Sequence, residues 1–228
     1  MFNALIDFIF PKTSITSDER IDENNSNRYL KDDEVLSLSK VTDEDLDELN
    51  NKVTADLSFS FFAFREGDEF SKIVYQLKYG GMKQLGIFLG ELAVKGLKLK
   101  FEKEILNEFD LVIPVPLYKT KYRERGYNQS DYICTGFNRY LDIKFVPDLV
   151  KRLRYTSTQT KLTREQRIDN MKDAFELNKK YKGQIYGKSI IVVDDVVTTG
   201  STMNEVIKVL KDNGCRKVMG CTIAMARR

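Results

Sequence analysis

Hydrophobic positions divide the chain into a polar first quarter and a remainder with regular apolar spacing. Residues 2–10 are mostly apolar, and their spacing predicts a short docking helix. Residues 12–50 are polar, acidic and poor in aromatic side chains, which predicts a mobile or loosely packed segment. Within that segment Thr42 is suited to cap a short helix at Asp43–Asn51. We therefore interpret residues 1–56 as a small acidic N-terminal appendage.

Regular patterns begin at residue 57 and continue to the C-terminus. Residues 57–64 are an aromatic run that is apolar on both faces, which predicts a strand covered on both sides. The spacing of apolar residues predicts two helices next, and from residue 110 onward strands and helices alternate. The expected elements in this region are helices at Asp68–Tyr79, Lys83–Lys98, Asn128–Leu141 and Thr163–Met171, strands at Leu111–Val115 and Leu149–Leu153, and an edge strand at Ala174–Leu177.

The last 40 residues carry the clearest pattern. Ser189–Val193 is fully apolar, as expected for a buried central strand of a parallel sheet. A helix is predicted at Ser201–Asn213 and a final strand at Val218–Met225, which together make one right-handed strand–helix–strand unit. Residues 57–228 are therefore predicted to form an α/β domain, with a mostly parallel twisted sheet flanked by helices.

The composition narrows the kinds of chemistry that this domain can perform. The chain has no histidine, so Ser-His-Asp catalysis, Cys-His catalysis and histidine metal sites are excluded. Its three cysteines and the lack of a secretion signal predict a reducing, cytoplasmic location with free thiols. The apolar stretch at residues 2–10 is too short to span a membrane, so no membrane insertion is expected.

Charge is distributed unevenly along the chain. The formal net charge is only +3, but residues 17–48 hold 12 acidic and 4 basic side chains. Residues 116–183 hold 16 basic and 8 acidic side chains, a surplus of 8 positive charges. Such a surplus favours anionic ligands such as phosphates or a nucleic-acid backbone, although an ordinary solvated surface explains it equally well.

The most specific chemistry lies in Ile190–Thr202, with the sequence IIVVDDVVTTGST. The apolar strand leads into Asp194 and Asp195, whose carboxylates can accept hydrogen bonds from ribose hydroxyls or lie near a hydrated Mg²⁺. The phosphate-binding candidates that follow are small or hydroxylated and precede a helix N-terminus: Thr198, Thr199, Gly200, Ser201 and Thr202. The segment matches neither a P-loop nor a dinucleotide fingerprint. The alternative is a capped turn without a ligand.

Three segments together resemble the ComF family, which includes ComFC of natural competence and the GntX-like proteins. They are residues 190–202, 111–129 (LVIPVPLYKTKYRERGYNQ) and 152–175 (RLRYTSTQTKLTREQRIDNMKDAF). The resemblance implies the type I phosphoribosyltransferase fold, and phosphoribosyl pyrophosphate with Mg²⁺ as ligands. It further implies a link to DNA uptake. Family members usually carry an N-terminal four-cysteine zinc finger, but this chain has no cysteine before Cys134, so no zinc is expected.

The same resemblance implies where the pyrophosphate and other anions bind. It places residues 115–117 on the pyrophosphate loop and the later block in the mobile loop of the fold. The implied anion-binding residues are Val115, Pro116, Leu117, Arg123, Arg125, Asn128, Gln129, Gln159, Arg164 and Arg167. Arginine suits bidentate phosphate contacts, although each single arginine is also explained by an ordinary surface charge.

Three hypotheses about function follow. The first is an enzyme that transfers the phosphoribosyl group to an unknown acceptor. The second is a non-catalytic module that binds a nucleotide or single-stranded DNA and works with competence proteins. Tyr118, Tyr122 and Tyr127, interleaved with basic residues, suit base stacking, although core packing explains them at least as well. The third is a regulator that senses phosphoribosyl pyrophosphate, ranked last because no helix-turn-helix is visible.

Overall fold

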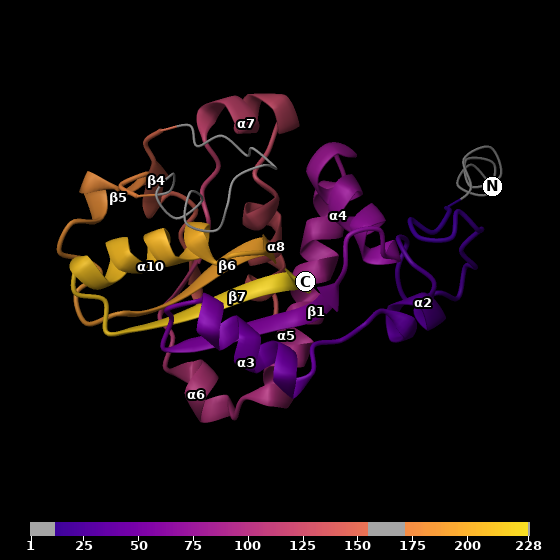
Figure 1. Cartoon of the computed structure of the whole chain (residues 1–228), viewed down its shortest axis with the longest axis horizontal. Coiled ribbons are helices and arrows are strands. Elements are labelled where there is room, and N and C mark those ends of the chain that lie inside the picture. The colour runs from indigo at the N-terminus through magenta and orange to yellow at the C-terminus, as the bar shows by residue number, and fades with distance from the viewer. Residues whose placement is uncertain (1–11, 155–171, 228) are drawn as a thin grey trace.

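A five-stranded parallel sheet forms the centre of the protein (Figure 1). The structure is a computed structural model, and residues 12–154 and 172–227 of it are described. The strand order is β1-β7-β6-β2-β3, and every neighbouring pair runs parallel. The strands are β1 (Leu57–Phe64), β2 (Leu111–Pro114), β3 (Lys144–Phe145), β6 (Ser189–Val197) and β7 (Lys217–Ala226). The predicted α/β class with a mostly parallel sheet is confirmed.

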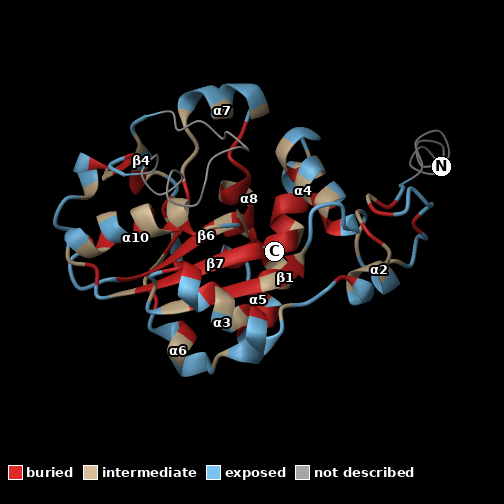
Figure 2. Ribbon diagram, in the orientation of Figure 1, coloured by how far each residue is buried: buried red, intermediate tan, exposed pale blue. Residues whose placement is uncertain are grey.

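Helices cover both faces of this sheet because its central strands are apolar on both sides. On one face lie α4 (Glu69–Tyr79), α5 (Lys83–Lys100) and α8 (Gln129–Asn138), packed in one buried cluster with Ile191 and Val193. On the other face lie α3 (Asp43–Lys52) and α10 (Ser201–Asp212), packed with Ile190 and Val192. Successive residues of β6 therefore serve opposite layers, as the two-residue period of a strand requires. Figure 2 shows the strands and the inner sides of these helices as buried.

The helix pair α5 and α8 approaches very closely because each helix presents a glycine to the other. A Cβ atom on Gly90 would lie 2.2 Å from the carbonyl oxygen of Ile133. A Cβ atom on Gly136 would lie 2.2 Å from the carbonyl oxygen of Ile87. Only glycine leaves room for backbones at this separation. The close contact holds α8 in place beside the sheet, and α8 supplies two side chains to the site described below.

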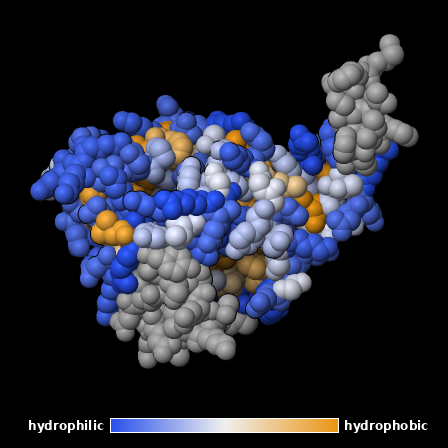
Figure 3. All heavy atoms as spheres, turned by 90° about the horizontal axis from the view of Figure 1, so that it is seen from above, coloured by the Kyte–Doolittle hydropathy of each residue, from blue (hydrophilic) through white to orange (hydrophobic). Residues whose placement is uncertain are grey.

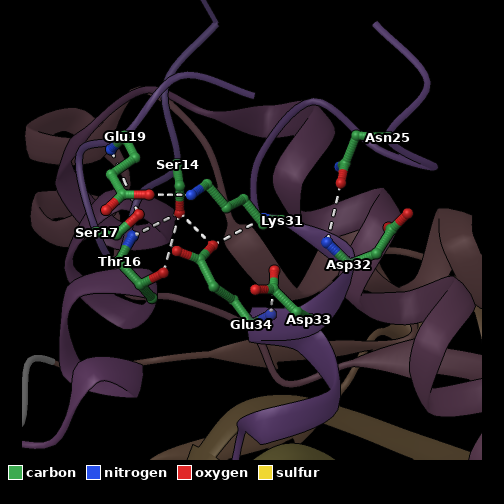
Figure 4. A network of polar contacts seen from close by, with 9 residues as sticks. All are labelled: Ser14, Thr16, Ser17, Glu19, Asn25, Lys31, Asp32, Asp33 and Glu34. Carbon is green, nitrogen blue, oxygen red and sulfur yellow. Dashed lines mark hydrogen bonds and ion pairs between the residues drawn. The ribbon is translucent and has the colours of Figure 1, made fainter. Parts of the chain in front are cut away.

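The N-terminal segment 12–40 is organised largely by polar contacts (Figure 4). The Ser14 hydroxyl donates to a Glu34 carboxylate oxygen at 2.5 Å, and Glu34 also accepts from the Lys31 amide at 2.7 Å. Lys31 in turn pairs with Glu19. The short helix α2 (Asp32–Ser37) lies within this network, while Leu30 is fully buried in the core cluster that includes Phe62. A polar network and the buried leucines Leu30 and Leu38 of the core cluster thus join this segment to the domain.

The chain between the N-terminal network and the sheet adds a second attachment. Lys40 forms an isolated antiparallel bridge with Phe62, on the side of β1 away from β7. The following helix α3 has the predicted Thr42 cap, whose hydroxyl accepts from the Asp45 amide at 3.2 Å. Arg227, just after β7, binds both carboxylate oxygens of Asp45, at 2.8 and 2.6 Å. The boundary at residue 56 remains a prediction.

Most elements expected from residue 57 onward are confirmed to within a few residues, with three exceptions. Ala174–Leu177 does not extend the main sheet, because β5 (Phe175–Leu177) pairs antiparallel with β4 (Val150–Arg152) in a separate ribbon. Strand β6 continues past residue 193 to Val197, since its pairing with β7 is maintained to the end. Four elements were not predicted: strand β3 (Lys144–Phe145), helices α6 (Lys103–Asn107) and α7 (Lys119–Arg125), and the 3₁₀ turn η1 (Lys179–Tyr181).

Two expected helices, at residues 2–10 and 163–171, lie outside the described residues. Within the part of the chain that the structure describes, every helix is too short or too polar to cross a membrane. All three cysteines are buried and free. Burial raises the pKa of the Cys221 thiol, so this side chain is an inert part of the core.

Candidate functional site

The carboxyl ends of the strands meet at one edge of the sheet because all five strands are parallel. Ligands of open α/β sheets bind at this edge. Residues 198–200 follow β6 and lead into α10, residues 115–118 follow β2, and the helix α4 comes soon after β1. Helices α4 and α7 rise on this side of the molecule in Figure 1. Figure 3 shows the molecule from above, and hydrophilic residues predominate on the part of that face that is not drawn in grey.

The turn between β6 and α10 depends on Gly200. Its φ angle is +79°, in the left-handed region that glycine adopts at little cost. A Cβ atom on this residue would lie 2.2 Å from the carbonyl oxygen of Lys52 at the end of α3. Asn204 joins the same two elements, donating to the Lys52 carbonyl at 2.8 Å and accepting from the Thr54 amide at 2.9 Å. The turn is therefore held against α3, with no space for a larger residue.

This turn presents hydrogen-bond donors at the start of α10. The hydroxyls of Thr199 and Ser201 lie 3.0 Å apart, and Thr198 is exposed. Among the described residues, the amide N–H groups of Thr202 and Met203 have no acceptor. Free amides at a helix N-terminus attract anions through their own dipoles and that of the helix. The predicted phosphate-binding residues are thus consecutive in a turn that suits a phosphate.

The sequence pattern predicted that the two acids follow the end of the strand. In the structure both acids lie inside β6. The Asp194 Oδ1 atom accepts from the Ser130 hydroxyl at 3.1 Å and from the Asp195 amide at 2.9 Å. The Asp195 Oδ2 atom accepts from Gln129 Nε2 at 3.2 Å and pairs with Lys78 Nζ at 3.1 Å. Residues from α4, α8 and β6 therefore meet at the acid pair.

The environments of the two carboxylates differ. Burial and the neighbouring Asp195 charge raise the pKa of Asp194, whereas the Asp195 amide, Lys78 and Ser130 act in the opposite direction. Among the described residues, Asp194 Oδ2 has no hydrogen-bond partner, while both oxygens of Asp195 are engaged. Asp194 can therefore accept a new donor from a ligand without losing an existing contact.

The second predicted block lies next to the acids. The Val115 amide donates to the Val193 carbonyl at 2.8 Å, which extends the pairing of β2 with β6 by one residue. Asn128 caps α8 and donates to the Val115 carbonyl at 3.1 Å, so the loop after β2 is tied to the helix. Arg125 donates to Gln129 at 2.9 Å, and Gln129 donates onward to Asp195. A chain of side chains thus connects the basic block with the acid pair.

Other predicted residues have different positions. Arg123 is exposed on α7 and makes no hydrogen bond or ion pair with the acids. Pro116 and Leu117 are half-buried in the loop that follows β2. Gln159, Arg164 and Arg167 lie outside the described residues. Tyr127 is buried and donates to the Leu77 carbonyl at 2.5 Å, so the suggestion that it stacks on bases is wrong.

Sequence reasoning missed Lys78 and Ser130. Lys78 lies on a helix 117 positions before Asp195, and no spacing rule connects the two. Ser130 follows Asn128-Gln129 directly and is fully buried, which is unusual for a serine. The sequence signal for Ser130 was its position directly after the quoted block 111–129, whereas Lys78 had none beyond its place near the end of a predicted helix.

Comparisons with known proteins agree with this geometry. Residues 135–228 match the family described as "Phosphoribosyl transferase domain". Competence protein F of Haemophilus influenzae is 39% identical over 117 residues, which cover 51% of this chain and 51% of that protein. The chain is similar to ComF-type competence proteins, and its C-terminal part matches the phosphoribosyltransferase domain. DNA utilization protein YhgH of Escherichia coli O6:H1 is 34% identical over 148 residues, covering 65% of this chain and 63% of that protein.

Each of these matches covers only part of the chain and part of the matched protein. The chain spans 51% and 63% of the lengths of those two relatives. A solved structure of a hypoxanthine-guanine phosphoribosyltransferase from Bacillus anthracis is 16% identical, with a TM-score of 0.37. That match covers 62% of this chain and 79% of that one. Activity, substrate and partners are therefore matters for proposal.

Proposed function

We propose that this protein binds phosphoribosyl pyrophosphate at the carboxyl edge of its sheet and transfers the phosphoribosyl group to an acceptor. The observation that carries the proposal is the continuity of Asp194–Thr202. In one stretch of nine residues, carboxylates suited to ribose hydroxyls lead into a turn suited to a terminal phosphate. The matched phosphoribosyl transferase family includes this stretch.

Each part of the site has a chemical role in this proposal. The turn at 198–202 holds the 5-phosphate through amides and hydroxyls. Asp194 and Asp195 accept hydrogen bonds from the ribose hydroxyls, and the loop at 115–117 lies beside the pyrophosphate. The bond between C1 and the pyrophosphate oxygen breaks through an oxocarbenium-like transition state, and pyrophosphate leaves with the electron pair. The acceptor atom then bonds to C1 and releases its proton to solvent. The site accelerates this step by positioning and electrostatic stabilisation.

The donor set fits Mg²⁺ only together with a ligand. Among residues 12–154 and 172–227, no group of three or more Asp, Glu, Cys or His side chains is placed to hold a metal ion. Mg²⁺ in proteins is commonly bound by one or two carboxylates, substrate phosphates and water. Asp194, which keeps one oxygen without a partner among the described residues, and Asp195 beside it would hold such an ion with the pyrophosphate. Bound Mg²⁺ would neutralise charge on the departing pyrophosphate.

Calorimetric titration tests the pocket. Wild-type protein is titrated with phosphoribosyl pyrophosphate, with and without Mg²⁺, and compared with Asp194→Asn and Asp195→Asn. We expect binding that is stronger with Mg²⁺ and weaker by about tenfold or more in each variant, the typical effect of losing a charged hydrogen-bond partner. Asp212→Asn, an acid at the other end of α10, is the control and should bind like wild type. Absence of binding by the wild type would contradict the proposal.

Catalysis requires a separate measurement. Pyrophosphate release is followed while bases and amines are offered as acceptors to the protein with Mg²⁺ and phosphoribosyl pyrophosphate. Release that depends on one acceptor and is lost in Asp194→Asn supports transfer. Binding without release for any acceptor would leave a phosphoribosyl-binding protein and refute the transferase part of the proposal.

A second candidate function is binding of single-stranded DNA beside the candidate phosphoribosyl site. Tyr75 and Tyr79 on α4 are 61% and 58% exposed, with ring centroids 5.3 Å apart. The Arg125 guanidinium lies 5.4 Å from the Tyr79 ring centroid, and α7 carries exposed Lys119 and Arg123 and half-buried Lys121. Aromatic platforms beside cations are typical of single-strand binders. The names of two relatives, competence protein and DNA utilization protein, also favour a function that involves DNA.

Oligonucleotide affinity tests this second function. Affinity for a single-stranded oligonucleotide should fall steeply with added salt, and should fall further in Tyr79→Ala and in Lys121→Ala/Arg123→Ala. Tyr186→Ala, which removes an exposed tyrosine that lies just before β6, is the control. An affinity that is insensitive to salt and to the α4 and α7 variants would exclude DNA binding at this surface.

A further inference from the structure

The last turn of α4 is attached to the site through three consecutive residues. The Leu77 carbonyl accepts a hydrogen bond from the Tyr127 hydroxyl at 2.5 Å. Lys78 Nζ lies 3.1 Å from Asp195 Oδ2, and the Tyr79 ring lies beside the Arg125 guanidinium. These contacts involve β6 and the segment that leads into α8. The turn is therefore fixed against the acid pair from both sides, although it is remote from it in sequence.

Lys78 supplies a positive charge next to the buried Asp195 carboxylate. The Asp195 side chain is only 6% exposed, and its two oxygens accept from the Val196 amide and from Gln129. Both of those donors are neutral. Among the described residues, Lys78 is the one cation in an ion pair with either acid. A buried carboxylate without a counter-ion is strongly unfavourable, and it responds by taking up a proton or by moving toward water.

We propose that Lys78 is a positioning residue of the phosphoribosyl site, which holds the Asp195 carboxylate charged and oriented toward the ribose. This inference rests on the proposed function, because it assigns a role within the same pocket. Lys78 acts through Asp195. Helix α4, which carries Lys78, therefore forms one side of the site. Removal of the ammonium therefore weakens ligand binding even though the turn at 198–202 is unchanged.

A direct role in holding ligand phosphates makes a different prediction. If Lys78 touched the ligand itself, its loss and the loss of Asp195 would reduce affinity independently, and the two effects would multiply. If Lys78 acts through Asp195, its loss has little further effect once Asp195 is neutral. A double-mutant cycle separates these cases.

The experiment compares wild type, Lys78→Met, Lys78→Gln, Lys78→Arg, Asp195→Asn and the double variant Lys78→Met/Asp195→Asn. Affinity for phosphoribosyl pyrophosphate with Mg²⁺ is measured by calorimetry, and the unfolding temperature by calorimetric scanning. We expect Lys78→Met and Lys78→Gln to lose about tenfold or more in affinity. Lys78→Arg, which keeps the charge, should stay within about threefold of wild type. Lys208→Met, an exposed lysine on α10, is the control and should change neither quantity.

The same set of variants is also informative if the wild type does not bind the ligand. In that case the proposed function fails, and the unfolding temperatures still report on the pair. A loss in the double variant that is smaller than the sum of the single losses supports the Lys78–Asp195 pairing. Additive temperature losses, multiplied affinity losses, or a Lys78→Met variant that binds like wild type would each overturn the inference. If the Lys78→Met variant does not fold, the Lys78→Gln variant keeps the test valid.

Discussion

The two walls of the candidate site are built in different ways. The wall formed by residues 198–202 is local in its donors and its helix N-terminus, which one turn supplies, and this turn packs against Lys52 at the end of α3. The wall formed by Leu77–Tyr79 depends on long-range contacts, with partners at Asp195, Tyr127 and Arg125. One backbone substitution can therefore disrupt the local wall. The long-range wall is expected to weaken by small steps as single contacts are removed.

The largest expected effect comes from breaking the local wall with Gly200→Ala. The new Cβ would meet the Lys52 carbonyl at 2.2 Å, and the backbone would keep a φ of +79°. We expect a loss of about 2–5 kcal/mol in the free energy of unfolding, from left-handed backbone strain and overpacking together. Denaturant unfolding measures the loss, and ligand affinity should fall with it.

The matched control for this change is Gly183→Ala. Gly183 has a similar φ of +77°, but a Cβ there would meet nothing within 4 Å. The Gly183→Ala variant should lose only the part of the free energy of unfolding that comes from backbone strain, about 1–2 kcal/mol. It should bind the ligand as the wild type does. Equal losses in the two variants would mean that the contact between the turn and α3 does not matter.

A smaller effect that depends on pH is expected at Asp131, on the helix that brings Gln129 and Ser130 to the acids. Burial raises the pKa of Asp131 to about 6. Its unfolded value is about 3.9, so the folded protein holds the proton more tightly and stability falls as pH rises from about 4 to 6. Asp131→Asn should therefore stabilise the protein by about 1–2 kcal/mol above pH 6 and have no effect below about pH 4.

Asp45→Asn is the control with the opposite sign. The Arg227 guanidinium holds the pKa of Asp45 well below its usual range. The Asp45 carboxylate therefore stabilises the fold above about pH 4, and that stability is lost in acid. Unfolding temperatures measured at several pH values should show a loss for Asp45→Asn where Asp131→Asn shows a gain. The same sign for both variants would contradict the assigned environments.

The smallest effect is expected from loosening the long-range wall at Tyr127. Tyr127→Phe removes the hydrogen bond to the Leu77 carbonyl and should cost about 0.5–1.5 kcal/mol. Affinity for phosphoribosyl pyrophosphate should fall slightly, because Lys78 follows Leu77 directly. The control is Tyr181→Phe, which removes a hydrogen bond of 2.7 Å to Asp148 outside the site. If both variants bind ligand equally well, α4 does not position the acid pair.

The same contrast explains how much of the molecule the sequence could predict. Strands β1, β2, β6 and β7 and the turn at 198–202 were predictable because apolar runs and TTGST act through neighbouring residues. The end of β6 was placed four residues early, since the acids interrupt the apolar run while the pairing with β7 continues. Helix α7 was missed because its seven residues are polar or basic apart from one tyrosine. Such a short helix has no apolar stripe to reveal it.

Contacts between distant segments could not be predicted in this way. The pairing of Lys78 with Asp195 depends on how α4 lies against the sheet, which a single sequence does not specify. The antiparallel ribbon of β4 and β5 is a similar case, because short strands carry no information about which partner they choose. The site residues named from the sequence therefore remain a prediction, and Lys78 and Ser130, which contact the acid pair, were not among them.

The most direct test of the central claim is a nuclear magnetic resonance titration of ¹⁵N-labelled protein with phosphoribosyl pyrophosphate and Mg²⁺. The account predicts that the largest amide shifts occur in Thr199–Met203, with smaller shifts around Asp194 and Gln129. Gly183 should not move. Saturable shifts confined to α7 or to the N-terminal segment, with the amides of 199–203 unchanged, would contradict the assignment of this turn as the phosphate cradle.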